Sequence, residues 1–210
     1  EGYGKYSFIG INPLATLRAT ACDVTIDYDG TTTSHQVDPY SLLPEFTHGR
    51  KAFGFITYDG VRVKERLPDR HPPKAVPDFF FRLYKTVICF DHQAQKLIIN
   101  HEGSDAEIDE IVQKLFTITS APTFVKQAKV ELVSDVSDEE YMQKVIRAKE
   151  YIRQGDIFQV VLSRTFIADL DIPPFALYRA LRKLNPTPYL YLFEEEEFAI
   201  AGASPELLVG

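Results

Sequence analysis

Two stretches of the chain carry residue patterns that could bind a phosphate group or a metal ion. Gly2 to Ser7 (GYGKYS) partly matches a phosphate-binding loop, but such a loop needs GxxxxGK and then Ser or Thr, between a strand and a helix. Here Tyr6 follows Lys5 and a strand-like run comes next, so we reject that interpretation. The run Glu194 to Glu197 could hold a metal. Adjacent carboxylates at a hairpin turn point in alternate directions and stay solvated, so we expect no metal site there.

Histidine and cysteine give no catalytic pattern either. The histidines show no HExxH motif and no tight Cys/His spacing, and we interpret them as surface or hairpin residues. They are His35, His48, His71, His92 and His101. Cys22 and Cys89 lie far apart, each in an apolar run, which favours two reduced, buried thiols over a disulfide or a metal pair. No Ser/His/Asp or Cys/His arrangement follows from the spacing.

Composition excludes several classes of function. The chain has 210 residues, 45% of them hydrophobic, and a formal net charge of -7 without any Lys/Arg cluster. An acidic chain without a basic stripe repels phosphate backbones, so we expect no nucleic-acid partner. No apolar run approaches the roughly 20 residues that a membrane span needs, so we expect no membrane insertion. We expect a cytoplasmic protein.

The predicted helices and strands fall into two halves of the chain, and the first half, to about residue 125, is mostly strand-like. Asp29-Gly30 predicts a hairpin turn, and Gly54 inside an apolar run predicts a close backbone approach. Ser104 and Glu107 form a capping-box pattern that begins one helix. A Pro-rich loop spans 67–77. The predicted strands are 6–10, 23–28, 51–58, 79–90 and 97–99.

The second half predicts two helices and further strands. A capping box, Ser137 with Glu140, begins an amphipathic helix that stops at Gly155. Residues 156–166 (DIFQVVLSRTF) predict a buried strand, in which Gln159 and Ser163 would be structural hydrogen-bonding residues. A second helix runs from the proline pair 173–174 to Asn185-Pro186, followed by a hairpin, 189–193 with 198–201, and a last strand near Glu206. Strands and helices without strict βαβ alternation predict an α+β fold.

Four segments resemble signature segments of the chorismate-using enzymes, the family of anthranilate synthase component I and aminodeoxychorismate synthase component I. They occur in the family's order and spread over almost the whole chain, and 55–91 resembles the family's intervening region. The segments are KYSFIG (5–10) with NP (12–13), AKEYIRQGDIFQVVLS (148–163), NPTPYL (185–190) and GASPE (202–206).

The resemblance implies an N-terminal portion of the family's two-layer α/β sandwich, with a mostly antiparallel sheet and flanking helices. Residues 1–125 would be the N-terminal, effector-side region, and 126–210 the truncated beginning of the chorismate-binding catalytic domain. It also implies a longer parent whose magnesium-binding glutamates lie beyond residue 210. We therefore expect no metal ligand in these residues and no activity from them alone.

The family reaction is magnesium-dependent. Ammonia adds to the chorismate ring, the ring hydroxyl leaves, and elimination of pyruvate gives anthranilate. A separate glutamine amidotransferase subunit, component II, supplies the ammonia. The resemblance implies chorismate as substrate, Mg²⁺ as cofactor, and L-tryptophan as feedback inhibitor in the first step of tryptophan biosynthesis.

The resemblance also carries candidate site residues. By its place in GASPE, Glu206 matches a glutamate that lines the family's active site, whereas without the resemblance it would be a strand-end carboxylate bound by backbone donors. The tryptophan effector would contact Pro188, Tyr189 and Leu190, with Tyr6 and Ser7 in the facing strand. The alternative for Tyr189 and Leu190 is simple core packing.

Three functions remain open at this stage. KYSFIG and NPTPYLYL look closer to the tryptophan enzyme, an anthranilate synthase large subunit and a lyase. The second is aminodeoxychorismate synthase component I of folate synthesis. The third treats these residues alone as an amino-acid-binding regulatory module. The family usually has Arg, Ser and Met where this chain has Lys5, Thr187 and Leu190.

Overall fold

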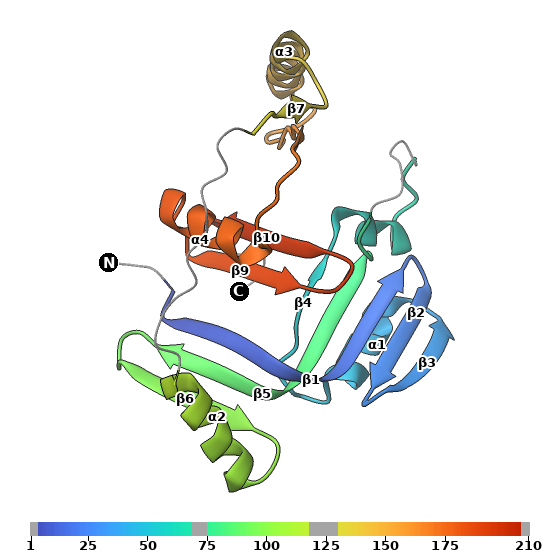
Figure 1. The fold of residues 1–210 in the computed structure, drawn as a ribbon. Helices are drawn as coiled ribbons and strands as arrows, with labels where there is room; N and C mark the ends of the chain where they lie inside the picture. Colours follow the sequence, from blue (N-terminus) through green and yellow to red (C-terminus); the bar gives the residue numbers. More distant parts are fainter. Residues whose placement is uncertain (1–3, 69–74, 118–129, 207–210) are drawn as a thin grey trace. The chain divides into compact units, whose positions relative to one another are not determined.

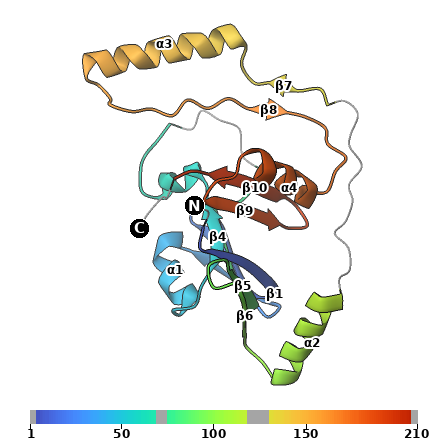
Figure 2. The ribbon, with the colours of Figure 1, turned by 90° about the vertical axis from the view of Figure 1, so that its left-hand side faces the viewer.

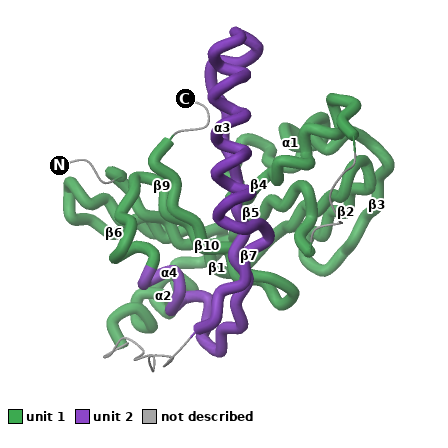
Figure 3. Tube along the Cα trace, turned by 90° about the horizontal axis from the view of Figure 1, so that it is seen from above, with its two compact units in different colours: residues 1–121, 181–210 green, residues 122–180 purple. Residues whose placement is uncertain are grey.

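A computed structural model describes residues 4–68, 75–117 and 130–206. It divides into two compact units, residues 1–121 with 181–210 and residues 122–180 (Figure 3). The predicted boundary at residue 125 lies outside the described residues. Residues 181–210 group with the first unit, although the prediction placed them in the second half. The prediction of an effector side and a catalytic side stays a prediction.

The first unit is built on a six-stranded antiparallel sheet with the order β3-β2-β1-β5-β4, in which β6 also pairs with β5 (Figure 1). The long central strands β1 and β5 pair along most of their length, with a register shift between Pro13 and Ala15. The strands are β1 (Tyr6–Thr20), β2 (Asp23–Tyr28), β3 (Thr31–Gln36), β4 (Phe53–Ile56), β5 (Phe79–Asp91) and β6 (Lys96–His101).

Three helical segments accompany this sheet: α1 (Pro39–Thr47), the 3-10 helix η1 (Tyr58–Val63) and α2 (Asp105–Thr117). α1 and η1 were not predicted. The start of α1 does carry a readable signal, because Asp38 accepts from the Tyr40 backbone N–H and Pro39 stands in the first turn. α2 confirms the predicted capping box, since the backbone N–H of Ser104 donates to Glu107 Oε2 at 2.8 Å.

The hairpin of β9 (Tyr189–Glu194) and β10 (Ala199–Ser204) completes the first unit (Figure 2). The side chain of Phe79 belongs to the core that includes Phe46 of α1, whereas the ring of Phe80 contacts Phe193 of β9. Successive side chains of a strand point to opposite faces, so α1 and the hairpin cover opposite faces of the sheet. The core cluster consists of Ala15, Leu17, Ala19, Val24, Phe46, Phe79 and Leu83.

The second unit contains α3 (Asp138–Gln154), a short pair of strands, β7 (Val133–Ser134) with β8 (Phe166–Ile167), and most of α4 (Pro174–Leu184). The predicted capping box of α3 is confirmed, since Ser137 accepts from the backbone N–H of Glu140 at 3.1 Å. Gly155 ends the helix in the left-handed conformation, at φ 83°. No residue of α3 is buried.

The predicted buried strand 156–166 is wrong. Apart from the start of β8 at Phe166, the segment is irregular, and Phe158 and Val161 are 94% and 83% exposed. A strand needs a hydrogen-bonding partner, and β8 finds one for only two residues, on β7. Gln159 and Ser163 are accordingly exposed rather than held in a buried strand. An apolar composition alone does not supply such a partner.

The α+β class, with a mostly antiparallel sheet and flanking helices, is confirmed. Cys22 and Cys89 are free thiols, the first half-buried and the second buried. None of the helices in the described ranges is long and apolar enough to cross a membrane. His71 and most of the predicted last strand lie outside the described residues.

Candidate functional site

The two segments predicted to form an effector site come from opposite ends of the chain, and the structure brings their backbones together. A Cβ atom placed on Gly4 would lie 3.3 Å from the carbonyl oxygen of Pro188. Gly4 lies two residues before the start of β1, and Pro188 directly precedes the start of β9. Tyr6 and Tyr189 therefore begin two strands that start beside each other.

Tyr6 opens a row of aromatic rings that crosses the sheet from β1 to β5. Ring centroids are 6.1 Å apart for Tyr6 and Phe8, 5.9 Å for Phe8 and Phe53, and 6.0 Å for Phe53 and Tyr84. Tyr6 and Phe8 are 43% and 42% exposed, so aromatic surface remains open there. Partly open aromatic rings suit a flat apolar ligand.

Charged and polar groups flank this row. The Lys5 ammonium lies 5.1 Å from the centroid of the Tyr6 ring, and its hydrogen bond with Tyr6 raises the pKa of Lys5. Ser7 Oγ lies 2.7 Å from His92 Nε2, so this hydroxyl already has a partner within the protein. His92 stands in the β5–β6 turn, and sequence reasoning gave no reason to pair it with Ser7. The predicted surface position of His92 agrees with the exposed setting of this contact.

The opposing segment contains one buried polar group, at a position that the sequence marked only as a departure from the family. Thr187 is 9% exposed, and its Oγ1 has no hydrogen-bond partner among the residues that the structure describes. Burying an unpaired hydroxyl costs about 1–3 kcal/mol, so such a group is worth explaining. Pro188 is exposed, Tyr189 is 41% exposed and Leu190 is half-buried. Tyr189 is thus not a core side chain in this structure.

The hairpin register links this segment to Glu206. Tyr189 pairs with Ser204 across the hairpin, and Leu190 pairs with Ala203. Ser204 Oγ then donates to the backbone carbonyl of Glu206 at 3.1 Å and lies 3.4 Å from its backbone N–H. Glu206 itself is exposed, two residues beyond the end of β10. A displacement of Tyr189 would therefore reach the backbone of Glu206 through a single cross-strand pair.

A buried carboxylate fastens the other end of the hairpin to the sheet. Glu195, whose side chain is 6% exposed, accepts from both terminal nitrogens of Arg82 at 2.6 Å and from Arg18 at 3.2 Å. Charge-assisted bonds of this two-pronged kind are the stronger ones in proteins. The prediction that the whole run Glu194 to Glu197 stays solvated is wrong for Glu195, because two arginines of the sheet face reach it. The other three glutamates are exposed.

Aromatic rings surround this ion-pair cluster. The guanidinium carbons of Arg18 and Arg82 lie 5.4 and 5.3 Å from the ring centroid of Phe80, which is fully buried. Phe80 also contacts Phe193 and Phe198 of the hairpin edge to face. The alternation of Arg18 and Arg82 with apolar neighbours could have suggested that they share a sheet face, but nothing in the sequence pairs them with Glu195.

The described residues include no group of three or more His, Cys, Asp or Glu side chains that could hold a metal ion. The Glu195 carboxylate already forms ion pairs with Arg18 and Arg82. Glu206 belongs to no such group of possible ligands among the described residues. The expectation that the magnesium ligands lie beyond residue 210 stays a prediction.

Comparisons with known proteins agree with the sequence resemblance. A family model described as chorismate binding enzyme matches residues 1–210. Anthranilate synthase component 1 of Lactococcus lactis subsp. lactis (strain IL1403) is 32% identical over 228 residues, covering 98% of this chain and 50% of that protein. Aminodeoxychorismate synthase component 1 of Bacillus subtilis (strain 168) is 30% identical over 237 residues, covering 98% and 49%.

A solved structure shares the fold. The crystal structure of anthranilate synthase component I from Streptococcus pneumoniae TIGR4 matches with a TM-score of 0.76 and 25% identity, over 98% of this chain and 51% of that one. The chain thus spans about half the length of the relatives that it matches.

Proposed function

The chain belongs to the family of chorismate binding enzymes, and we propose on that basis that it is part of the large subunit of an anthranilate synthase. The observation that carries the proposal is the match over the whole chain, together with the named anthranilate synthase relatives. The proposed reaction consumes chorismate and ammonia and forms anthranilate, pyruvate and water. The ammonia comes from a glutamine amidotransferase partner, component II.

Glu206 is the proposed active-site residue of this chain. It is exposed just beyond β10, where a carboxyl group can approach a substrate, and its backbone is held by Ser204. A carboxylic acid in such a place can protonate a departing ring hydroxyl, which then leaves as water. Magnesium, which the resemblance implies, would neutralise substrate carboxylates when bound, with ligands outside the described residues.

Tryptophan is the proposed effector, bound between Tyr6 and Ser7 on one side and Pro188, Tyr189 and Leu190 on the other. The approach of Gly4 to Pro188, the open rings of Tyr6 and Tyr189, and the unpaired hydroxyl of Thr187 support this site. We add Thr187 as a hydrogen-bonding contact, since a ligand amino or carboxylate group would satisfy its hydroxyl.

Inhibition from this site requires two states of the protein that tryptophan binds unequally. A structural change at the tryptophan site would reach Glu206 by a short route. Tyr189 pairs with Ser204 across the hairpin, and Ser204 binds the backbone of Glu206. Glu195 and its two arginines fix the turn end of the hairpin to the sheet. We therefore expect the opposite end, which carries Tyr189, to be the part that moves when tryptophan binds.

A second candidate has one observation in its favour: the Bacillus subtilis aminodeoxychorismate synthase component 1 is about as similar as the anthranilate synthases. In that case the same chain would serve p-aminobenzoate synthesis.

The two candidates are separated by their products. The full-length parent is incubated with chorismate, magnesium and an ammonium salt, and the products are resolved by chromatography with fluorescence detection. Anthranilate with pyruvate is the expected result, and the 210-residue chain alone is expected to form none. Accumulation of aminodeoxychorismate without pyruvate would establish the second candidate. Formation of neither anthranilate nor aminodeoxychorismate would refute both.

A further inference from the structure

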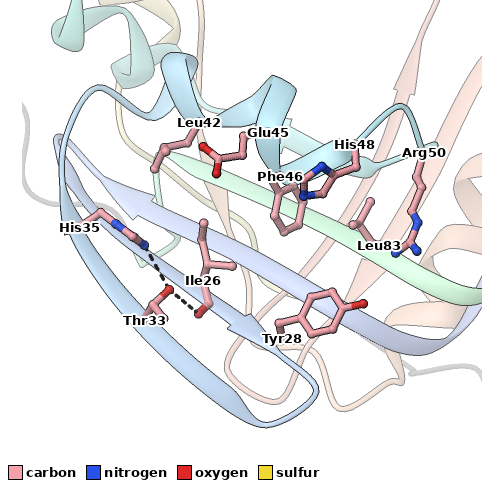
Figure 4. A pocket seen from close by; sticks show the side chains of 10 residues that line it. All are labelled: Ile26, Tyr28, Thr33, His35, Leu42, Glu45, Phe46, His48, Arg50 and Leu83. Atoms are coloured by element: carbon pink, nitrogen blue, oxygen red, sulfur yellow. Dashed lines mark hydrogen bonds between the residues drawn. The ribbon is translucent and has the colours of Figure 1, made fainter.

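A cavity of about 450 Å³ lies between α1 and the β2–β3 side of the sheet (Figure 4). It is on the face opposite the β9–β10 hairpin, away from Glu206 and from the proposed tryptophan site. Its volume falls within the roughly 300–1,000 Å³ of small-molecule sites. It shares no lining residue with the site described above.

The floor of the cavity is apolar and made of buried side chains. Phe46 of α1 and Leu83 of β5 line it and are only 7% and 2% exposed, and Ile26 and Leu42 flank them. Opposite α1, Tyr28 leaves about half of its side chain uncovered, at 49% exposure. A ring inserted between Tyr28 and Phe46 would cover this aromatic surface.

The two ends of the cavity differ in charge. Figure 4 shows Arg50 beside Leu83 and Tyr28 at one end, and His35 with Thr33 at the other. Arg50 is positively charged, and its Nη2 forms a surface ion pair with Glu102 Oε2 at 3.1 Å. Both partners of that pair are more than a third exposed, so it contributes little and leaves the cation able to bind an anion.

The end near His35 is already engaged in hydrogen bonds. Thr33 Oγ1 donates to the carbonyl of Ile26 at 3.4 Å and lies 3.1 Å from His35 Nε2. Because a hydroxyl has a single proton, His35 Nε2 must be the donor to Thr33 when Thr33 donates to Ile26. An incoming carboxylate therefore finds its cation at the Arg50 end.

The charge of the ligand is limited by Glu45, which lines the same cavity from α1. Arg50 can compensate one negative charge of a ligand, whereas a second charge on the same ligand would face the Glu45 carboxylate. An apolar body can then lie between Tyr28 and Phe46. We propose that this cavity binds an aromatic monocarboxylate, with its carboxylate at Arg50 and its ring against Phe46 and Leu83.

Benzoate is a suitable probe, because it has the ring and the single charge and nothing else. The chain is titrated with benzoate while the methyl resonances of Ile26, Leu42 and Leu83 are followed by NMR. Benzamide, which lacks the charge, and acetate, which lacks the ring, are titrated in parallel. We expect saturable shifts at these three residues with benzoate, and at least tenfold weaker binding of both comparators.

Two variants locate the site. Arg50→Gln is expected to weaken benzoate at least tenfold, and Arg153→Gln, another exposed arginine paired with a glutamate, is the matched control that should change nothing. Thr33→Trp, on the exposed strand β3, should fill the cavity and abolish the shifts without touching the core. Equal binding of benzamide, unchanged affinity in Arg50→Gln, or shifts that persist in Thr33→Trp would each overturn the proposal.

Discussion

The β9–β10 hairpin and the helix α3 carry equally clear sequence patterns, yet the two elements differ in how their side chains are buried within their own units. The hairpin packs Phe193 and Phe198 against Phe80 and buries Glu195 between two arginines. α3 has a complete capping box and a regular amphipathic pattern, but no buried residue. A pattern therefore predicts the type of element, whereas its burial depends on a partner that another part of the chain must provide.

The largest expected effect concerns the anchor of the hairpin. Glu195→Ala leaves Arg18 and Arg82 facing each other without a carboxylate, and losing one partner of a buried ion pair costs about 3–5 kcal/mol. Urea denaturation followed by tyrosine fluorescence measures the change in the free energy of unfolding. Glu197→Ala is the matched control, because Glu197 is 74% exposed in its pair with Arg18, and it should cost no more than about 1 kcal/mol. Equal costs for both variants would show that the hairpin is not held by Glu195.

The contrast between the two regions can also be tested with apolar side chains. Leu17 is fully buried, so Leu17→Ala should cost about 2–5 kcal/mol of unfolding free energy. Ile146 of α3 is 57% exposed, and Ile146→Ala should stay within about 0.5 kcal/mol. Thermal unfolding monitored by circular dichroism gives both values. A cost above about 2 kcal/mol for Ile146→Ala would mean that α3 is covered in solution.

The next prediction concerns chemistry rather than packing. In the full-length parent, Glu206→Gln keeps the size of an exposed side chain but removes its charge and its acidity. We expect a loss of roughly 10²-fold in the rate of anthranilate formation, with an unchanged melting temperature. Glu196→Gln, another exposed glutamate of the hairpin, should leave the rate unchanged. Normal turnover of Glu206→Gln would return Glu206 to a structural role.

The smallest stability effect should come from the two capping boxes. Ser104→Ala and Ser137→Ala each remove the side-chain acceptor of a helix N-terminus, which costs about 1 kcal/mol. α2 packs through the buried Ile111, so removing its cap should lower the free energy of global unfolding. α3 has no buried residue, so removing its cap should only reduce the helical circular-dichroism signal. Identical cooperative shifts for both variants would contradict the difference between the regions.

Local signals in the sequence predicted much of the fold. Asp29-Gly30, the two capping boxes and Gly155 depend on neighbouring residues, and all appear where they were predicted. The predicted close backbone approach at Gly54 is also confirmed, because a Cβ atom added there would lie 2.0 Å from the Phe80 carbonyl oxygen. Turns, helix caps and close backbone contacts each require particular residue types at particular positions, so the local sequence is enough to predict them.

Long-range features were not predictable in the same way. Glu195 was expected to be solvated, because nothing local indicates that Arg18 and Arg82 will surround it. The segment 156–166 was expected to be a buried strand, because its composition is right, yet pairing is decided elsewhere in the chain. The positions of the proposed site residues came from the family resemblance alone, and the unpaired hydroxyl of Thr187 came from the structure alone.

The proposed coupling of a tryptophan site to Glu206 through the hairpin is tested most directly by inhibition curves of the full-length parent. Activity is titrated with tryptophan for the wild type, for Tyr189→Ala and for the control Tyr58→Ala, whose side chain is 79% exposed on η1. We expect Tyr189→Ala to need at least about fivefold more tryptophan for half inhibition, equivalent to about 1 kcal/mol, with nearly unchanged activity in its absence. Tyr58→Ala should follow the wild type. Superimposable curves for wild type and Tyr189→Ala, or a wild type that tryptophan does not inhibit, would contradict the account.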